Sequence, residues 1–283
     1  MNVVWAQGAQ LLAQASSEDQ GPFIKLLEHL NPHHYSWTPR IMLGPIDLSP
    51  TNAVVNIWLA AFLVILLFWV ASAKRSIVPR GIQNVVEASM DFVKDNIVYS
   101  VMKPADARVW FPYIATIFFF ILFLNSVGLI PWIGFTPTSN IWVTLAFALG
   151  VYGLAVAIGI SRHGFLNFWR KTLIPEGLPG KGPVGKALIT VFFLFLEIIS
   201  QLARPVSLAV RLFANMVADH VILLVFVGFI FLASGIFLVI MVPVAMVLEI
   251  VFFMFAMFVA FIQAVIFAFL STLYINDALH PGH

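Results

Sequence analysis

The chain has 283 residues, of which 61% are hydrophobic and only 10% are charged, and its formal net charge is +2. A soluble domain normally carries about 25% charged residues, so this composition leaves too little polar surface for a water-soluble fold. It is also too apolar for a disordered chain. The absence of cysteine excludes disulfides, thiolate metal sites and cysteine nucleophiles. A lipid bilayer is therefore the solvent that fits.

Residues 1–52 precede the first long apolar stretch and are expected to form an external segment, with one short helix around residues 24–30. Residues 1–20 lack the basic start and long apolar centre of a signal peptide, although a cleaved leader is left open. The segment contains three histidines without a further ligand at metal-site spacing. They are expected to be exposed loop residues, and no metal site is predicted: His29, His33 and His34.

The first apolar stretch, residues 53–73, is long enough to cross a hydrocarbon core of about 30 Å. Residues 81–103 differ, because apolar residues recur at helical spacing while polar residues fill the other side. This stretch is too polar to span. It predicts an amphipathic helix that lies in the membrane surface.

Two further spans are predicted at residues 109–130 and 141–161. A basic loop rich in glycine and proline follows the second of them. The loop carries Arg170, Lys171, Lys181 and Lys186.

Two longer apolar stretches, residues 187–232 and 237–274, complete a single membrane domain over residues 53–276. Lys and Arg cluster after the first span and in the loop after the third, which makes those loops cytoplasmic or matrix-facing. About five crossings then place the N-terminus outside and residues 277–283 inside as a tail. The predicted fold class is an all-α membrane protein with one interfacial amphipathic helix.

The last two stretches are too long to cross upright, because a helix rises about 1.5 Å per residue. Each stretch is either two spans or one long, tilted helix. Splitting the first of them needs a turn near Arg204 and Pro205, where no charged loop exists. The pattern favours two long tilted helices, and the split is left open.

Residues 180–187, Gly-Lys-Gly-Pro-Val-Gly-Lys-Ala, come within one residue of the P-loop pattern. Ala187 stands where that pattern requires a hydroxyl to ligate magnesium, and no strand precedes the loop. We therefore expect a flexible cytoplasmic loop and no nucleotide site.

A polar stripe runs along residues 187–232. A charge near the centre of a bilayer costs at least a few kcal/mol, so such residues are functional by default. Measured from Arg211 at about 100° per residue, the stripe covers roughly 120° of the helix. Its members are Glu197, Gln201, Arg204, Ser207, Arg211, Asn215 and Asp219. His220 falls on the opposite face.

Some of these charges have a simpler explanation, since residues near helix ends can snorkel to the interface. This alternative stays open for Glu197 and Arg204. It is disfavoured for Arg211, which has nearly equal apolar lengths on either side.

The last stretch adds Glu249 and Gln263, which are 14 residues apart and share a face within about 40°. A buried glutamine is often a tether between helices. A partner for the polar stripe is an equal alternative.

Arg211 remains charged at physiological pH and cannot itself relay a proton. It can attract a carboxylate, lower the pKa of that group and make it release its proton. It also repels cations, which blocks a direct leak. These properties suit a stator that faces a moving carboxylate on another subunit better than a self-contained transporter, which needs its own titrating site.

Residues 207–216, Ser-Leu-Ala-Val-Arg-Leu-Phe-Ala-Asn-Met, resemble the signature of subunit a of F-type ATP synthases, called subunit 6 in mitochondria. The Gln-Ala-Val-Ile-Phe run from Gln263 resembles the second signature of that family. Pro131, Pro137 and Thr138 also fit its pattern. The likeness covers roughly residues 50–276.

The resemblance implies that the last two helices form a tilted hairpin against a rotating ring of c subunits, with two offset half-channels leading to the ring's carboxylate. Arg211 would be the essential arginine, Asn215 the asparagine one turn on and Gln263 the glutamine of the facing helix. Glu197, Asn125 and His220 match polar positions associated with the half-channels. Peripheral-stalk b subunits and the rest of the complex would be partners.

Two positions depart from the family pattern. Ala256 stands where many members carry Glu or His, and Glu249, seven residues earlier on nearly the same face, is a candidate replacement. Gly128 stands where some relatives have an acidic residue. These departures affect the lining of the external half-channel and leave the assignment of Arg211 untouched.

The sequence thus predicts an ion-translocating stator subunit, most simply for protons, that is no enzyme on its own and needs no cofactor or nucleic acid. A bacterial inner membrane is favoured over a mitochondrial inner membrane. Two alternatives stay open: a self-contained channel or secondary transporter, and a structural subunit of another respiratory complex. Ring size and the choice between protons and sodium are left open.

Overall fold

The computed structural model describes residues 42–43, 46–47, 51–73, 81–130, 137–173, 182–232 and 236–281. Five of its helices are long and apolar enough to cross a membrane. They are α3 (Asn52–Ala73), α6 (Pro104–Gly128), α7 (Ile141–His163), α9 (Gly182–Leu232) and α10 (Ile236–Leu279). The predicted all-α class with five crossings is confirmed. The short helix and the histidines expected before residue 42 lie outside the described residues.

Two short strands precede the first span. β1 (Met42–Leu43) pairs antiparallel with β2 (Ile46–Asp47), with Met42 opposite Asp47 and Leu43 opposite Ile46. Hydropathy did not indicate this pair, because two residues are too few to show a period.

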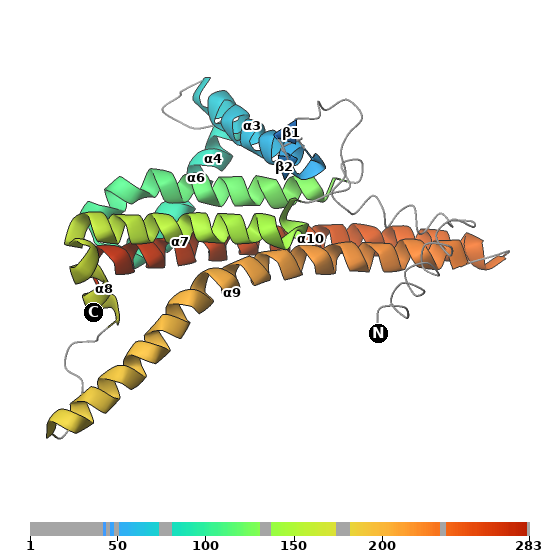
Figure 1. Ribbon diagram of the computed structural model, residues 1–283. Helices are drawn as coiled ribbons and strands as arrows, with labels where there is room; N and C mark the ends of the chain where they lie inside the picture. Colours follow the sequence, from blue (N-terminus) through green and yellow to red (C-terminus); the bar gives the residue numbers. More distant parts are fainter. Residues whose placement is uncertain are drawn as a thin grey trace, which may run out of the picture.

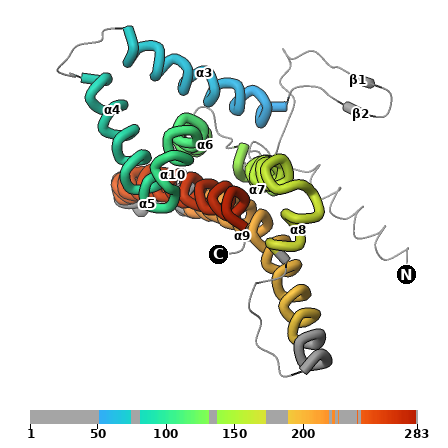
Figure 2. The backbone as a smooth tube through the Cα atoms, turned by 90° about the vertical axis from the view of Figure 1, so that its left-hand side faces the viewer, coloured from blue at the N-terminus to red at the C-terminus, as the bar shows by residue number. Residues whose placement is uncertain are grey.

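The predicted amphipathic helix is a helical run in three parts. α4 (Ile82–Val93) continues into a π-helical segment, η1 (Lys94–Val98), and then into α5 (Tyr99–Val101). Figure 2 shows α4 leading from α3 towards α5, which lies beside α10. Val93 and Ile97 of the apolar stripe are fully buried in the protein, whereas Ile82 and Val85 at its start are exposed. Its position in the membrane surface stays a prediction.

The start of α6 lies five residues before the predicted span. Pro104 is favoured at the first helical position because its missing N–H is unpaired there in any case. Asp106 in the first turn complements the helix dipole. Both residues extend the helix beyond the apolar stretch that hydropathy detects.

The expectation of a loop over the residues after α7 is wrong for part of that segment. Gly164, with φ 79°, ends α7, and α8 (Phe165–Leu173) follows with Arg170 and Lys171 in its last turn. Phe168 of α8 is buried against Gly159 of α7, where a side chain would collide with its ring. Residues 182–187 of the P-loop-like run are helical, as the start of α9, and not a loop.

α9 and α10 are each one continuous helix, not two spans. They pack antiparallel, and Figure 1 shows them side by side with α6 and α7 while α9 bends along its course. Pro205 within α9 lacks the N–H that would bond to the carbonyl of Gln201, a common cause of helix bending. α10 continues to Leu279, beyond the predicted end of this helix at residue 274. The tilt of both helices in the bilayer stays a prediction.

The core lies where α10 meets α6, α7 and α9. Large buried side chains fill it, and α3 closes over α6 from the outside. They include Ile114, Phe118, Leu208, Leu212 and Phe267. This packing determines which parts of α9 face inwards.

Candidate functional site

The polar stripe of α9 meets α10 at one direct contact. Asn215 Nδ2 donates a hydrogen bond to Gln263 Oε1 over 2.8 Å. Gln263 is almost fully buried, at 1% exposure, and its Nε2 has no hydrogen-bond partner among the described residues. Gln263 is therefore both a partner of the stripe and a buried group with an N–H donor still available.

Arg211 lies one turn before Asn215 on α9, and its side chain is exposed. Ser207, one turn further back, is exposed as well, whereas Leu208 and Leu212 beside them are completely buried. No described residue forms a hydrogen bond or an ion pair with Arg211. The guanidinium therefore stands at the edge of the face that α9 turns away from the rest of the chain.

The stripe consequently does not face a single neighbour. The edge that carries Gln201 and Asn215 faces α7 and α10. The edge that carries Ser207 and Arg211 faces outwards. The helical wheel predicted the common stripe, but not this division.

At the other end of the stripe, Gln201 links two helices. Tyr152 of α7 donates its hydroxyl to Gln201 Oε1 over 2.9 Å, and Gln201 Nε2 donates to Glu197 Oε1 over 2.8 Å. Glu197 is half-buried in this chain of hydrogen bonds.

Arg204 forms an ion pair with Asp277 near the end of α10, with 3.0 Å between Nη1 and Oδ2. The guanidinium lies 5.9 Å from the centre of the Tyr274 ring, and the Tyr274 hydroxyl donates to the Arg204 carbonyl oxygen over 3.4 Å. Arg204 therefore has partners inside the protein.

A small cavity of about 30 Å³ lies between these groups, where α7, α8, α9 and α10 meet. A cavity needs about 10–15 Å³ to hold one water, so this space fits one or two. Polar side chains that surround it include Tyr152, Gln201, Arg204, Tyr274 and Asp277. Three of these residues were not predicted from the sequence: Tyr152, Tyr274 and Asp277. Asp277 was assigned to the tail and was therefore not considered as a partner of the stripe.

Asn125 lies on α6, completely buried, and its Oδ1 accepts a hydrogen bond of 3.1 Å from Thr138 Oγ1. Its Nδ2 has no partner among the described residues. Thr138 belongs to the 3-10 helix η2 (Pro137–Ser139), which contacts α6 and α9. The structure thus places Asn125 near α9 without a hydrogen bond to the stripe within the described part of the chain.

Glu249, Ala256 and Gly128 take no part in these contacts within the described part of the chain. Glu249 is exposed, whereas Ala256 and Gln263 on nearly the same face of α10 are buried. Gly128 is buried at the end of α6. Asp219 and His220 belong to α9.

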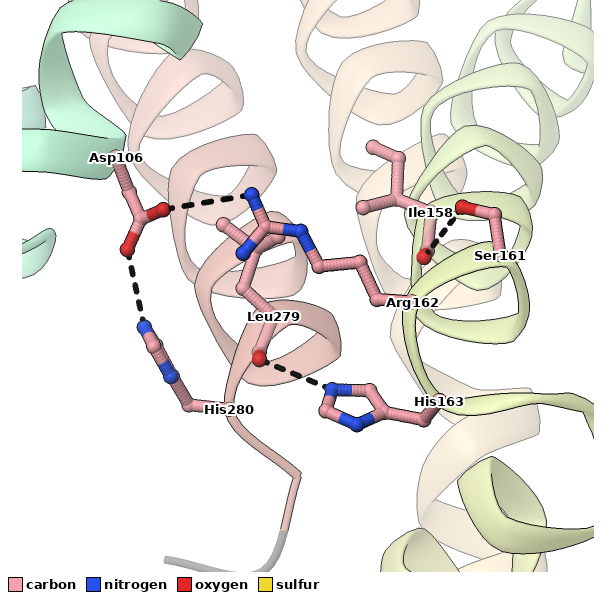
Figure 3. Close-up of polar contacts among 7 residues, drawn as sticks. All are labelled: Asp106, Ile158, Ser161, Arg162, His163, Leu279 and His280. Carbon is pink, nitrogen blue, oxygen red and sulfur yellow. Dashed lines mark hydrogen bonds and ion pairs between the residues drawn. The ribbon is translucent and has the colours of Figure 1, made fainter.

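A second polar cluster, not predicted from the sequence, joins three helix ends (Figure 3). Asp106 of α6 contacts Arg162 of α7 over 3.7 Å and His280, just after α10, over 3.1 Å. His163 Nε2 lies 3.1 Å from the Leu279 carbonyl oxygen. The cluster connects the end of α10 to both α6 and α7.

Five long apolar helices and a polar stripe with an outward-facing arginine define a multi-pass helical membrane protein with ionisable groups at its helix interfaces. No group of three potential metal ligands of the His, Cys, Asp or Glu type occurs among the described residues.

Comparison with known proteins makes the class specific. The family model for the ATP synthase A chain matches residues 54–276. ATP synthase subunit a of Magnetococcus marinus is 38% identical over 259 residues, covering 89% of this chain and 93% of the relative. That of Brucella ovis is 37% identical, covering 87% and 95%, and that of Beijerinckia indica is 35% identical, covering 84% and 90%. The chain belongs to the ATP synthase subunit a family.

Proposed function

We propose that this chain is the proton-translocating stator subunit of its ATP synthase, with Arg211 as the electrostatic gate between two half-channels that lead to a c-ring carboxylate. Family membership supports the place in the membrane sector of the complex. The exposed position of Arg211 in a membrane-crossing helix supports its role as the gate.

The outward face of α9 is the proposed contact with the ring. Within residues 189–218 of α9, only 6% of an apolar 18-residue window is buried, against 22% in α3 and 39% in α6. Val206 and Val210 are exposed beside Ser207 and Arg211. An arginine facing lipid near the bilayer centre is costly. A partner that brings a carboxylate to Arg211 removes that cost, and a c-ring subunit is such a partner.

Proton release follows from the charge of the arginine. A carboxylate that approaches Arg211 has its pKa lowered by the positive charge and gives up its proton. The guanidinium keeps its positive charge throughout, because this group is not deprotonated in proteins. It therefore separates the two half-channels without carrying the ion.

The external access route is proposed to pass Asn125 and Gln263. Each has an unpaired amide donor among the described residues, and buried donors of this kind are normally satisfied by water. They support a hydrated route that reaches Arg211 past Asn215. Glu249, Asp219 and His220 are proposed to belong to the same external route.

On the cytoplasmic side, the route would run along Glu197, Gln201 and Arg204 towards Asp277. The small cavity among these groups supports it, because one or two waters there would extend the hydrogen-bonded chain. The side is assigned by the positive-inside rule.

The remaining parts of the proposal follow from the family. The chain has no catalysis of its own and works within the complex, held by peripheral-stalk b subunits. A bacterial inner membrane is the proposed location, since the relatives named above come from bacteria.

The test measures ATP-driven proton pumping in inverted membrane vesicles with Arg211→Ala. Pumping is expected to be lost, because the ring carboxylate no longer meets a cation. Arg170→Ala is the matched control, since Arg170 is exposed on α8 away from the stripe and its loss should leave pumping intact. Undiminished pumping with Arg211→Ala would refute the gate. A purified chain that conducts ions without any c subunit would instead support a self-contained channel.

A further inference from the structure

A pocket of about 460 Å³ opens where the amphipathic helical run meets the start of α6. Its size lies in the range of small-molecule sites. Four elements contribute to its wall, since Glu87 and Asp91 come from α4, Lys94 from η1, Tyr99 from α5 and Arg108 from α6. None of these residues belongs to the stripe of α9.

The π-helical segment determines the shape of this wall. Lys94 and Tyr99 are five residues apart and would point about 140° away from each other in a regular α-helix. In η1 the Tyr99 N–H bonds to the Lys94 carbonyl, five residues back, so one turn holds an extra residue. The Lys94 Nζ consequently lies 5.9 Å from the centre of the Tyr99 ring. Such π-bulges are frequent at functional sites.

The charges around the pocket are balanced. It has two cations, Lys94 and Arg108, and two carboxylates, Glu87 and Asp91. No ion pair within 4.0 Å joins these four groups, all of which the structure describes. Glu87 accepts one hydrogen bond of 2.7 Å from Gln83. The cations and the carboxylates therefore retain capacity for a ligand that carries both signs of charge.

Apolar side chains complete the wall, with Met90 from α4 and Phe111 from α6. The positive-inside rule places the start of α6 at the cytoplasmic surface, where lipid headgroups lie. Pockets with basic residues between helices on this side are suited to headgroups.

We propose that this pocket binds the headgroup of phosphatidylethanolamine, with Lys94 and Arg108 on the phosphate, Glu87 and Asp91 on the primary ammonium, and Met90 and Phe111 against the glycerol end of the acyl chains. The carboxylates select a zwitterionic headgroup, because an anionic one would meet them without an ammonium to offset the repulsion. This site is independent of the proposed proton route.

The experiment uses the intact ATP synthase complex containing this chain, reconstituted in liposomes with a phosphatidylethanolamine that carries a photoreactive group near the glycerol. Mass spectrometry locates the labelled residues after irradiation. Labelling is expected within residues 82–111. Unlabelled phosphatidylethanolamine should compete about tenfold better than phosphatidylglycerol, and inorganic phosphate should not compete at millimolar concentration.

The variants separate the two halves of the headgroup. Lys94→Gln with Arg108→Gln should reduce labelling about tenfold, because charge-assisted hydrogen bonds to the phosphate are lost. Glu87→Gln with Asp91→Asn should keep the labelling but abolish the preference over phosphatidylglycerol. Lys103→Gln is the control, since Lys103 is exposed nearby but does not line the pocket.

Several results would overturn the proposal. Unchanged labelling in both double variants would show that the lipid lies elsewhere. Equal competition by phosphatidylglycerol would exclude recognition of the ammonium, and displacement by inorganic phosphate would identify a free-anion site. Labelling of another subunit in place of residues 82–111 would show that protein fills the pocket.

Discussion

Asn215 and Gln263 are 48 residues apart in the chain and are joined by a hydrogen bond of 2.8 Å across α9 and α10. The bond lies one turn from Arg211, and its acceptor residue is almost fully buried. It fixes the register of the two long helices next to the proposed gate.

Replacing Gln263 with Leu should therefore impair function more than stability. In membrane proteins a hydrogen bond between helices contributes only about 0.6 kcal/mol on average. Proton pumping, by contrast, should fall at least about tenfold if Gln263 lines the route, which corresponds to an activation free energy higher by about 1.4 kcal/mol or more in the rate-limiting step. The measurement is ATP-driven pumping in vesicles together with the thermal stability of the complex.

Ser271→Ala is the matched control for that variant, because Ser271 is also a buried polar residue of α10. The substitution removes its side-chain hydrogen bond to the Phe267 carbonyl within the helix and should leave pumping unchanged. Equal losses of pumping in both variants would indicate a packing defect in α10.

Removing the Arg204–Asp277 ion pair should also reduce proton pumping while leaving the stability of the protein almost unchanged. Asp277→Asn should change the free energy of unfolding by less than about 1 kcal/mol, because the two side chains are 30% and 52% exposed. Pumping should nevertheless decrease if Asp277 ends the cytoplasmic route. Asp95→Asn, an exposed carboxylate on η1, is the control. Wild-type pumping by Asp277→Asn would remove Asp277 from the route.

Asp106 should hold the end of α10 in place. Asp106→Ala removes its contacts with both Arg162 and His280 (Figure 3). Hydrogen exchange of the amides near residues 276–280 should become about tenfold faster, since this corresponds to losing about 1.4 kcal/mol of local stability. Asp91→Ala, on α4, should leave these amides unchanged. Unaltered exchange in Asp106→Ala would show that packing alone holds the end of α10.

Gly159 should tolerate no side chain. A Cβ at this position would collide with the buried ring of Phe168, so Gly159→Ala should destabilise the junction of α7 and α8 by about 1–3 kcal/mol. Gly153→Ala, on the same helix with open space around it, should be neutral or stabilising by up to about 1 kcal/mol. Thermal unfolding of the complex compares the two. A neutral Gly159→Ala would show that α8 shifts at little cost.

Sequence reasoning succeeded best for the helices that lipid requires. The bilayer leaves no water to satisfy backbone groups, so an apolar stretch of sufficient length must be helical. For this reason the five spans could be predicted from the sequence. Their ends were predicted less accurately, because a helix can continue past its apolar stretch. α6 begins at Pro104, because a proline at the first helical position and Asp106 in the first turn extend the helix beyond its apolar part. α9 begins at Gly182, before its apolar part.

The elements that hydropathy missed are short or depend on contacts. α8 is only nine residues long, and its Phe168 is buried against a glycine of α7. The π-helical turn at Lys94 leaves the apolar pattern almost unchanged, so no period reveals it. Asp106 and Asp277 lie near helix ends, and their partners are far away in the chain.

By itself the sequence determined that this protein crosses a membrane about five times and that Arg211, Asn215 and Gln263 are the residues to examine, because a helical period and the cost of charge in lipid act locally. Only the tertiary structure decided which edge of the stripe is buried and that Arg211 faces outwards. Burial depends on how α7 and α10 pack against α9, and that packing is a property of the whole chain.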